Sequence, residues 1–329
     1  MRDGRVEAAA QAATPLWLGL DHLEGAFETL KSRLGEAPKH AVTMTGELCD
    51  AFDSRREGVA GLAAIAARHL PTGAASVYAG RAGFRPLDAA GAYAQDVASA
   101  NWHASAAWVG LRLRDALLVD IGSTTADLVP VVGGKVAAAG YTDAERLVAG
   151  ELVYTGMARS FAMALTDRAP FRGVWTPLMN EYFATSADVH RIVGDLPQGA
   201  DKMATADGRE KTVAASCARL ARMIGREPDE ASPREWEALA AWFAEAQLRA
   251  IADAAFLRLS RGDLAPDAPV VAAGVGESMA KELARRLGRP CVAFADLIGA
   301  DVEASHCAPA AAVALLAERM GALAPAIPS

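Results

Sequence analysis

Apolar residues in the first third of the chain recur with two periods, which predicts helices alternating with short strands. Between residues 20 and 30, four leucine or phenylalanine side chains share one helical face, and Pro38 follows that stretch. Runs of four or five small or β-branched residues between the helical stretches favour buried strands. The expected elements are helices at residues 21–34, 56–70 and 94–111 and strands at residues 41–45 and 75–78.

Beyond residue 140 the pattern becomes mainly helical. Ser232 precedes Pro233, which is a good beginning for a long helix because serine caps N-terminal N–H groups and proline suits the first turn. Residues 168–174 and 195–211 are rich in turn-forming residues and are expected to be loops. We expect helices at residues 143–149, 152–165, 212–224, 233–259, 277–287 and 305–320, short elements at 181–186 and 188–193, and strands at 269–273 and 291–295. The whole pattern predicts an α/β fold.

The segment of residues 117–136, LLVDIGSTTADLVPVVGGKV, carries the clearest chemical signal. Its alternating apolar positions and glycine turns predict strand, tight loop, strand, turn and strand. The loop Gly122, Ser123, Thr124 and Thr125 has small side chains, so its N–H and hydroxyl groups can surround an anion. Asp120, near the end of the first strand, would suit Mg²⁺, which prefers carboxylate oxygens. The loop therefore indicates a phosphate site; the alternative is an ordinary hairpin whose polar residues satisfy the turn.

Composition narrows the function classes. The chain has 329 residues, 52% of them hydrophobic, which favours two lobes or one elaborated domain. Its net charge of -7 argues against a nucleic-acid partner, which needs a basic surface. The four cysteines are far apart in the sequence, which favours reduced thiols in a reducing compartment over a disulfide framework. With no apolar run of about 18 residues and no leader-like N-terminus, we expect a cytoplasmic protein without a membrane partner.

A second glycine turn follows the strand expected at residues 269–273. Gly274 and Gly276 give half of the dinucleotide fingerprint, but Met279 occupies the third glycine position, so a nicotinamide cofactor is not expected. A glycine-rich strand end before a helix can still receive a nucleotide, a sugar or an anion. The alternative is a closely packed strand–helix turn.

These two glycine turns resemble, in this order, the second phosphate motif and the adenosine motif of the actin, hexokinase and Hsp70-like ATPase superfamily. Within this superfamily, five sequence blocks in residues 15–227 resemble one family more specifically. This resemblance indicates the hydantoinase/oxoprolinase-related family of the tetrahydromethanopterin-linked one-carbon transfer pathway. The blocks are VTMTGELCDAFDSRREGV, ASANWHASAAWVG, LLVDIGSTTADLVPVVGGKV, DAERLVAGELVYTGMARS and FRGVWTPLMNEYFATSADVHRIVGDLP.

The resemblance implies a two-lobed fold with ribonuclease H-like lobes. The expected N-terminal lobe comprises residues 1–115 with a returning C-terminal helix in residues 305–329. The expected C-terminal lobe comprises residues 116–304, with the phosphate hairpin and a helical insertion. The terminal helix at residues 305–320 should pack on the N-terminal lobe, as it does in the superfamily.

The family also implies a reaction. Its characterised archaeal members join an aminomethyl-furan-methyl diphosphate to the phenol of tyramine or γ-glutamyltyramine, forming an aryl ether and releasing diphosphate. A bacterial member would serve methylofuran synthesis. The implied partners are these two small molecules, and the implied cofactor is Mg²⁺. The alternatives are an ATP-dependent kinase or amidohydrolase of the hydantoinase/oxoprolinase type, or a non-catalytic member of a cofactor-biosynthesis complex.

Roles for individual residues follow from this resemblance. Glu47 is the first candidate and Asp53 the second for a base near the phenol, although Glu47 can also serve as a helix N-terminal charge. Arg146 could pair with a phosphate oxygen or form a structural ion pair. The full set is Glu47 and Asp53 as catalytic residues; Gly122, Ser123, Thr124, Thr125 and Arg146 for phosphate; Asp120 and Asp127 for the metal; and Asn101, Trp102, Glu151, Tyr154, Gly274 and Gly276 for the substrate pocket.

The beginning of the sequence departs from the family pattern. Family members begin with a strand and a G-x-D-x-G-G loop, the first phosphate motif, and Met1 lies just before the turn that normally follows it. We therefore expect this loop to be absent from the sequence, through a late start or a truncation. Residues 5–14 look extended, and the sheet edge exposed by missing strands would be a pairing surface for a homodimer.

Overall fold

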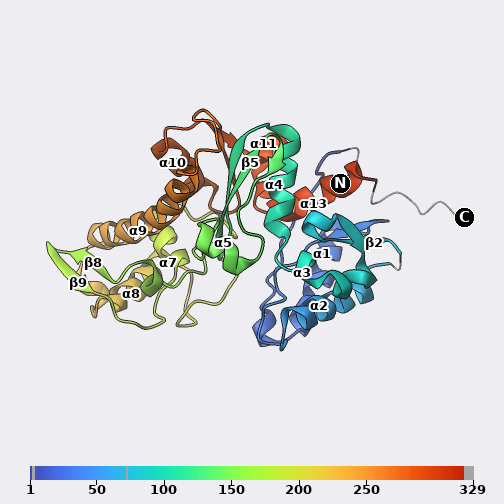
Figure 1. Ribbon diagram of the computed structural model, residues 1–329. Coiled ribbons are helices and arrows are strands. Elements are labelled where there is room, and N and C mark those ends of the chain that lie inside the picture. The colour runs from blue at the N-terminus through green and yellow to red at the C-terminus, as the bar shows by residue number, and fades with distance from the viewer. Residues whose placement is uncertain (2–3, 72, 322–329) are drawn as a thin grey trace, which may run out of the picture. The chain divides into compact units, whose positions relative to one another are not determined.

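The computed structural model describes residues 1, 4–71 and 73–321 (Figure 1). Packing divides the chain into two compact units, and the chain passes between them several times. Unit 1 comprises Met1–Leu118, Val129–Ala138 and Val292–Ser329, and unit 2 comprises Val119–Leu128 and Ala139–Cys291. Compared with the expected C-terminal lobe, residues 116–118, 129–138 and 292–304 lie in unit 1. Packing alone defines these units, so the expected lobe boundaries stay a prediction.

Unit 1 is built around a three-stranded sheet of order β1-β2-β3, in which β1 and β2 are parallel and β2 and β3 antiparallel. Apolar faces of α2 and of the segment Leu87–Val97 cover it, around buried Val59, Leu62 and Val77. The terminal helix α13 packs against α4 and β1 within this unit. The elements are η1 (Leu16–Leu18), α1 (Asp21–Leu34), β1 (His40–Val42), α2 (Arg55–His69), β2 (Ala75–Tyr78), η2 (Gly80–Ala82), β3 (Phe84–Pro86), η3 (Leu87–Tyr93), α3 (Ala94–Val97), α4 (Asn101–Arg112), α11 (Phe294–Ile298), α12 (Val302–Ser305) and α13 (Ala308–Arg319).

The phosphate hairpin lies in a second sheet, of order β11-β10-β4-β5-β6, with β7 paired to β5. β4 and β5 are neighbours joined by four residues, too few for a parallel crossover, so they form the antiparallel hairpin that the sequence predicted. The third strand, β6, pairs with β5 as predicted. The strands are β4 (Ala116–Ile121), β5 (Ala126–Val132), β6 (Lys135–Val136), β7 (Leu152–Val153), β10 (Val270–Ala273) and β11 (Cys291–Ala293).

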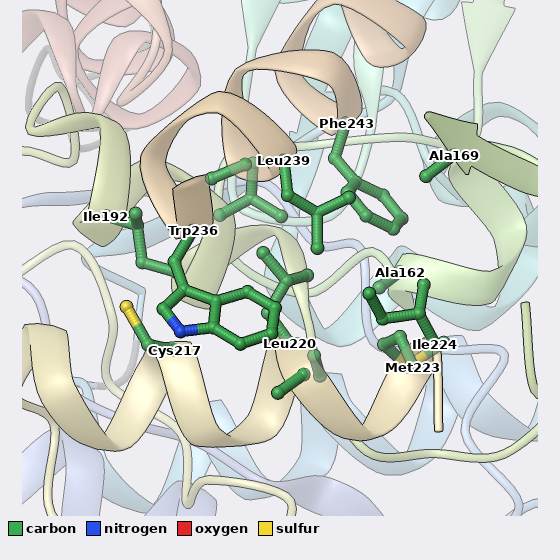
Figure 2. Close-up of a cluster of buried hydrophobic side chains, with 14 of the residues drawn as sticks. Ala162, Ala169, Ile192, Cys217, Leu220, Met223, Ile224, Trp236, Leu239 and Phe243 are labelled. Atoms are coloured by element: carbon green, nitrogen blue, oxygen red, sulfur yellow. The ribbon is translucent and has the colours of Figure 1, made fainter. Parts of the chain in front are cut away.

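The helical part of unit 2 has its own apolar core. Trp236, Leu239 and Phe243 of the long helix α9 face Cys217, Leu220 and Met223 of α8 (Figure 2). A two-stranded hairpin, β8–β9, packs on α9 through β8. The remaining elements of unit 2 are α5 (Asp143–Ala149), α6 (Ala162–Leu165), β8 (Arg168–Phe171), β9 (Val174–Pro177), α7 (Ser186–Val193), α8 (Val213–Met223), η4 (Pro228–Glu230), α9 (Pro233–Leu259) and α10 (Glu277–Arg286).

Three sequence predictions of secondary structure were wrong. The helix expected at residues 94–111 is broken into α3 and α4, because Ser99 between them has a left-handed backbone, φ +51°. The helix expected at residues 152–165 is a short strand, an irregular loop and the four-residue α6. The loop expected at residues 168–174 is instead strand β8, the turn and the first residue of β9, and the two turn residues, Arg172 and Gly173, both have positive φ.

The N-terminal segment, which was expected to be extended, belongs to no strand at residues 6–15. Gln11 donates a hydrogen bond to the carbonyl of His306 at 3.0 Å, so this segment runs beside the α12–α13 turn. Gly4 has a turn conformation, whereas Asp3 of the expected turn lies outside the described residues. Among helices of the described chain, none has the length and apolar content needed to cross a bilayer.

Candidate functional site

The loop of the β4–β5 hairpin is the accessible part of an otherwise buried element. All residues of β4 are buried, and Gly122, Ser123, Thr124 and Thr125 are each partly exposed. The N–H of Gly122 donates to the carbonyl of Thr125 at 2.9 Å, which closes the turn. The loop is therefore held at its base while its small and hydroxyl residues face solvent.

Residues 154–160 hold the loop from one side. The N–H groups of Ala158 and Arg159 donate to the carbonyl of Ser123 at 3.0 and 2.8 Å, and that of Met157 donates to Gly122 at 2.9 Å. Gly156 packs so closely that a Cβ built on it would lie 2.5 Å from the backbone nitrogen of Thr124. This close approach explains why the segment expected as helix is irregular: a regular helix could not bring its backbone against the loop.

Gly274 and Gly276 hold the hairpin from another side. The N–H of Gly276 donates to the carbonyl of Ile121 at 2.8 Å, and a Cβ on Gly274 would lie 2.3 Å from that oxygen. Both glycines are buried, and Gly274 has φ +83°. Their expected role in a substrate pocket is not supported by this burial, which favours the closely packed strand–helix turn.

Asp120 is a buried carboxylate beside this turn. It is 6% exposed, and a Cβ on Gly274 would lie 2.4 Å from its Oδ1. Burial, with a smaller contribution from the charge of Asp127, raises the pKa of Asp120 to about 8. Within the described chain, no hydrogen bond or ion pair satisfies this carboxylate. A buried acidic group without a protein partner beside an accessible hydroxyl loop fits a ligand of a bound cation.

Asp127 and Arg146 are engaged with each other instead. The Arg146 guanidinium donates to Asp127 Oδ1 and to the carbonyl of Glu151, both at 2.8 Å, and its side chain is only 1% exposed. Burial raises the pKa of Asp127, while the Arg146 charge and hydrogen bond oppose that shift. This arrangement supports the structural ion pair for Arg146 and leaves the phosphate role of Arg146 and the metal role of Asp127 without support.

Glu151 and Tyr154 also lie outside an open pocket. The Glu151 carboxylate is fully buried and accepts the N–H groups of Ala139 and Gly140 at 2.7–3.1 Å, with Arg258 Nε 3.5 Å away. Tyr154 is 71% exposed. The geometry gives Glu151 a structural role, fixing the turn that follows β6, and leaves Tyr154 as a surface residue.

Arg159 is the candidate that the sequence analysis missed. Its side chain is exposed, and its Nη1 donates to Thr124 Oγ1 at 3.3 Å, so a guanidinium lies directly beside the loop hydroxyls. An accessible guanidinium suits a phosphate, which it can bind with two parallel hydrogen bonds. The signal in the sequence was the TGMARS motif, but only the loop conformation of residues 154–160 brings Arg159 to the hairpin.

In unit 1, Glu47 follows β1 and is almost fully buried. Ser99 donates its Oγ hydrogen to Glu47 Oε1 at 2.7 Å, and Ser99 is the residue whose left-handed backbone separates α3 from α4. Strained backbone of this kind persists where the surroundings demand it, and here it directs a hydroxyl at a buried carboxylate. Asp53, the second candidate base, is exposed in the turn before α2.

The first turn of α4 follows Ser99 closely in sequence. Asn101 is partly exposed, whereas Trp102 is 2% exposed and belongs to the interior. The next residue, His103, shares a 2.8 Å hydrogen bond between its Nδ1 and the hydroxyl of Tyr78. Asn101 therefore stays a pocket candidate, and the burial of Trp102 favours a core role.

Metal binding by side chains alone is not evident, because the described residues contain no group of three or more His, Cys, Asp or Glu side chains arranged for a metal. Asp120 fits a single ligand position, and Asp127 does not because Arg146 engages it. A Mg²⁺ ion here would take most of its remaining ligands from water and substrate phosphate, as this ion commonly does.

Known proteins place the chain among enzymes of related architecture. Residues 39–320 match the model of the hydantoinase/oxoprolinase family. A (4-{4-[2-(gamma-L-glutamylamino)ethyl]phenoxymethyl}furan-2-yl)methanamine synthase of Methanocaldococcus jannaschii is 32% identical over 213 residues, 64% of this chain and 62% of that protein. The synthase of the same name from Methanococcus vannielii is 32% identical over 122 residues, 37% of this chain and 54% of that protein. The match therefore spans less than two thirds of either relative.

Among solved structures, a nucleotide-free acetone carboxylase, from work on ATP-dependent acetone carboxylation, superposes with a TM-score of 0.47 at 14% identity. The superposition covers 71% of this chain and 35% of the acetone carboxylase chain. The family match and the mixed α/β architecture confirm the fold class indicated by the sequence, the two-lobed actin/hexokinase/Hsp70-like ATPase fold. The chain belongs to the hydantoinase/oxoprolinase family.

Proposed function

We propose that the chain is a transferase that forms an aryl ether between an aminomethyl-furan-methyl diphosphate and the phenol of tyramine or γ-glutamyltyramine. The names of the two methanogen relatives support this product, since each contains a phenoxymethyl-furan unit. The observation that carries the proposal is the accessible loop of residues 122–125 with the exposed guanidinium of Arg159 beside it. This is a site for a phosphate-bearing group.

The proposed reaction breaks the bond between the furylmethyl carbon and the diphosphate oxygen, and the electron pair leaves with the diphosphate. The phenol oxygen bonds to that carbon, and its proton goes to a base. Positive charge develops on the furylmethyl carbon and negative charge on the leaving group, so a fixed cationic and hydrogen-bonding environment for the diphosphate accelerates the step.

The hairpin residues would bind that leaving group. Ser123, Thr124 and Thr125 offer hydroxyl groups, and Arg159 offers a guanidinium that already contacts Thr124. Asp120 would hold a Mg²⁺ ion near the phosphates, which supplies positive charge to the leaving diphosphate when bound. For the proton of the phenol, Glu47 is our candidate acceptor, with Ser99 donating to one oxygen and orienting the carboxylate.

Binding of inorganic pyrophosphate tests the proposal without the full substrates. Titration calorimetry of the wild-type protein should show Mg²⁺-dependent pyrophosphate binding, because the loop and Arg159 recognise a diphosphate. Arg159→Met should weaken this binding about tenfold or more, the value of one charge-assisted hydrogen bond. Arg234→Met is the control, since Arg234 is exposed on α9 and the charge change is the same.

The alternative functions give different outcomes. Tight binding of ATP with release of phosphate would favour the ATP-dependent kinase or amidohydrolase and contradict the transferase. A folded protein that binds neither pyrophosphate nor ATP would favour a non-catalytic partner. Equal affinity of Arg159→Met and Arg234→Met for pyrophosphate would contradict the assigned site.

A further inference from the structure

A series of hydrogen bonds through the buried side chain of Gln247 leads toward the β4–β5 hairpin. Gln247 lies on the face of α9 that otherwise forms an apolar core. Leu239 and Phe243 follow each other at four-residue spacing on this face, and Gln247 occupies the next position with no exposed surface (Figure 2 shows the apolar part). A buried amide in an apolar row is costly unless its groups are hydrogen-bonded. In the described chain, the hydrogen bonds of its side-chain amide lead to two places, the loop at residues 155–156 and His190.

The orientation of the Gln247 amide is fixed by its partners. Its Nε2 lies 2.8 Å from the carbonyl oxygen of Gly156, which can only accept, and 2.9 Å from Thr155 Oγ1. Nε2 must therefore be the amide nitrogen, because an oxygen in its place would face the carbonyl without a hydrogen. It follows that Gln247 presents its oxygen, Oε1, to His190 Nε2 at 2.8 Å.

His190 is consequently held on both sides by acceptors. Its Nε2 faces Gln247 Oε1, and its Nδ1 faces Asp195 Oδ1 at 2.8 Å. The ring therefore bridges the Gln247 amide and the partly exposed Asp195 carboxylate. Because Gln247 Oε1 accepts from His190 and Gln247 Nε2 donates to the Gly156 carbonyl, a rotated amide would lose both hydrogen bonds.

This series of hydrogen bonds ends at the β4–β5 hairpin. Gly156, whose carbonyl receives the Gln247 amide, is the residue whose Cβ would lie 2.5 Å from Thr124 N, and the next three residues donate to the carbonyls of Gly122 and Ser123. The Ser160 hydroxyl also accepts the Gly156 N–H at 2.8 Å. A shift of the Gly156 carbonyl is therefore transmitted to the loop and to Arg159.

We propose that Gln247, oriented by His190 and Asp195, is a positioning residue for the diphosphate site: it fixes the Gly156 backbone on which the Ser123–Thr124 loop and Arg159 depend. The proposal rests on the proposed function for the identity of the ligand. Gln247 touches no part of the open loop, so its effect on a ligand passes through Gly156.

The test compares Gln247→Leu with a matched buried variant, Ser216→Ala. Ser216 is fully buried in α8, and its hydroxyl bonds to Asp188 and Arg191, whose side chains make no hydrogen bond to residues 154–160 in the described chain. We expect Gln247→Leu to weaken Mg²⁺–pyrophosphate binding about tenfold or more and to speed hydrogen exchange of the Met157, Ala158 and Arg159 amides. Ser216→Ala should lower the melting temperature but leave both readouts unchanged.

If Gln247→Leu does not fold, Gln247→Glu tests the same proposal. The carboxylate keeps the shape and still accepts from His190, but it cannot donate to the Gly156 carbonyl or to Thr155 Oγ1, so the same changes are expected. Unchanged pyrophosphate affinity and unchanged exchange in a folded Gln247 variant would overturn the inference. If the wild-type protein binds no pyrophosphate, the proposed function fails, and the exchange of residues 157–159 alone decides whether Gln247 fixes the loop.

Discussion

Asp120 illustrates how one buried carboxylate links stability to ligand binding. Its pKa is raised to about 8, first by burial and then by the nearby charge of Asp127. In the free protein the carboxyl is therefore protonated at neutral pH, and a bound cation would favour the ionised form. A residue that only satisfied the turn would not remain without a hydrogen-bond partner in the described chain.

The raised pKa predicts the direction of a pH effect on stability. In the unfolded chain Asp120 releases its proton near its ordinary value of 3.8, while the folded protein retains it to about pH 8. The unfolded state therefore binds fewer protons in this window, so the free energy of unfolding should fall as pH rises from about 4 to about 8 and then level off.

Asp120→Asn removes this titration and keeps the size of the side chain. Urea unfolding of both proteins without metal, between about pH 5 and pH 8, should show a flatter pH dependence for the variant. The comparison isolates Asp120 because all other titrating groups are shared. Parallel curves for the two proteins would contradict the assigned environment of Asp120.

At the scale of elements, the hairpin is positioned by glycines that allow backbones to touch. Gly274 combines φ +83° with a Cβ position 2.3 Å from the Ile121 carbonyl, whereas Gly173, in the β8–β9 turn, has φ +79° and open space. Substitutions at the two positions therefore separate the free-energy cost of a left-handed backbone from the cost of a close approach between backbones.

Gly274→Ala should destabilise the protein by about 3 kcal/mol or more, since backbone strain and overpacking each cost about 1–3 kcal/mol. Gly173→Ala should cost only the backbone part, about 1 kcal/mol. Chemical denaturation measures both differences. Equal losses for the two variants would mean that the contact between Gly274 and Ile121 does not constrain the hairpin.

Elements with strong local signals were predictable, and elements shaped by distant contacts were not. Helices Asp21–Leu34 and Pro233–Leu259 have the bounds expected from apolar spacing, and the second has the Ser232–Glu235 capping box at its beginning. The break at Ser99 and the loop at residues 154–160 depend on Glu47 and on the hairpin, which are remote in sequence. Local propensity cannot report such contacts.

The same reason limits the prediction of the site. The candidate loop of residues 122–125 and Asp120 could be named from the sequence because strand, glycine turn and hydroxyls are contiguous, and their phosphate and metal roles stay predictions. Asp127, Arg146 and Glu151 looked available, yet the structure joins them in buried ion pairs and backbone hydrogen bonds. Arg159 and Gln247 were missed because only tertiary packing brings Arg159 to Thr124 and Gln247 to Gly156.

At the scale of the whole molecule, the chain combines a family fold with candidate residues in both units. Unit 2 contains the hairpin loop, Arg159 and the Gln247 hydrogen bonds, and unit 1 contains the Glu47–Ser99 pair. The hydantoinase/oxoprolinase family match covers residues 39–320, which lie in both units. The assignment to an ether-forming transferase depends on the diphosphate site, because fold alone does not define a reaction.

The most direct test is turnover with the proposed substrates. Protein, Mg²⁺, an aminomethyl-furan-methyl diphosphate and γ-glutamyltyramine are incubated without ATP, and diphosphate and ether are measured by enzymatic assay and mass spectrometry. The account predicts equal amounts of both products, formed only when the phenolic amine is present and reduced by Arg159→Met but not by Arg234→Met. A folded protein that binds pyrophosphate but forms no ether with either tyramine or γ-glutamyltyramine, or that instead releases phosphate from ATP, would contradict it.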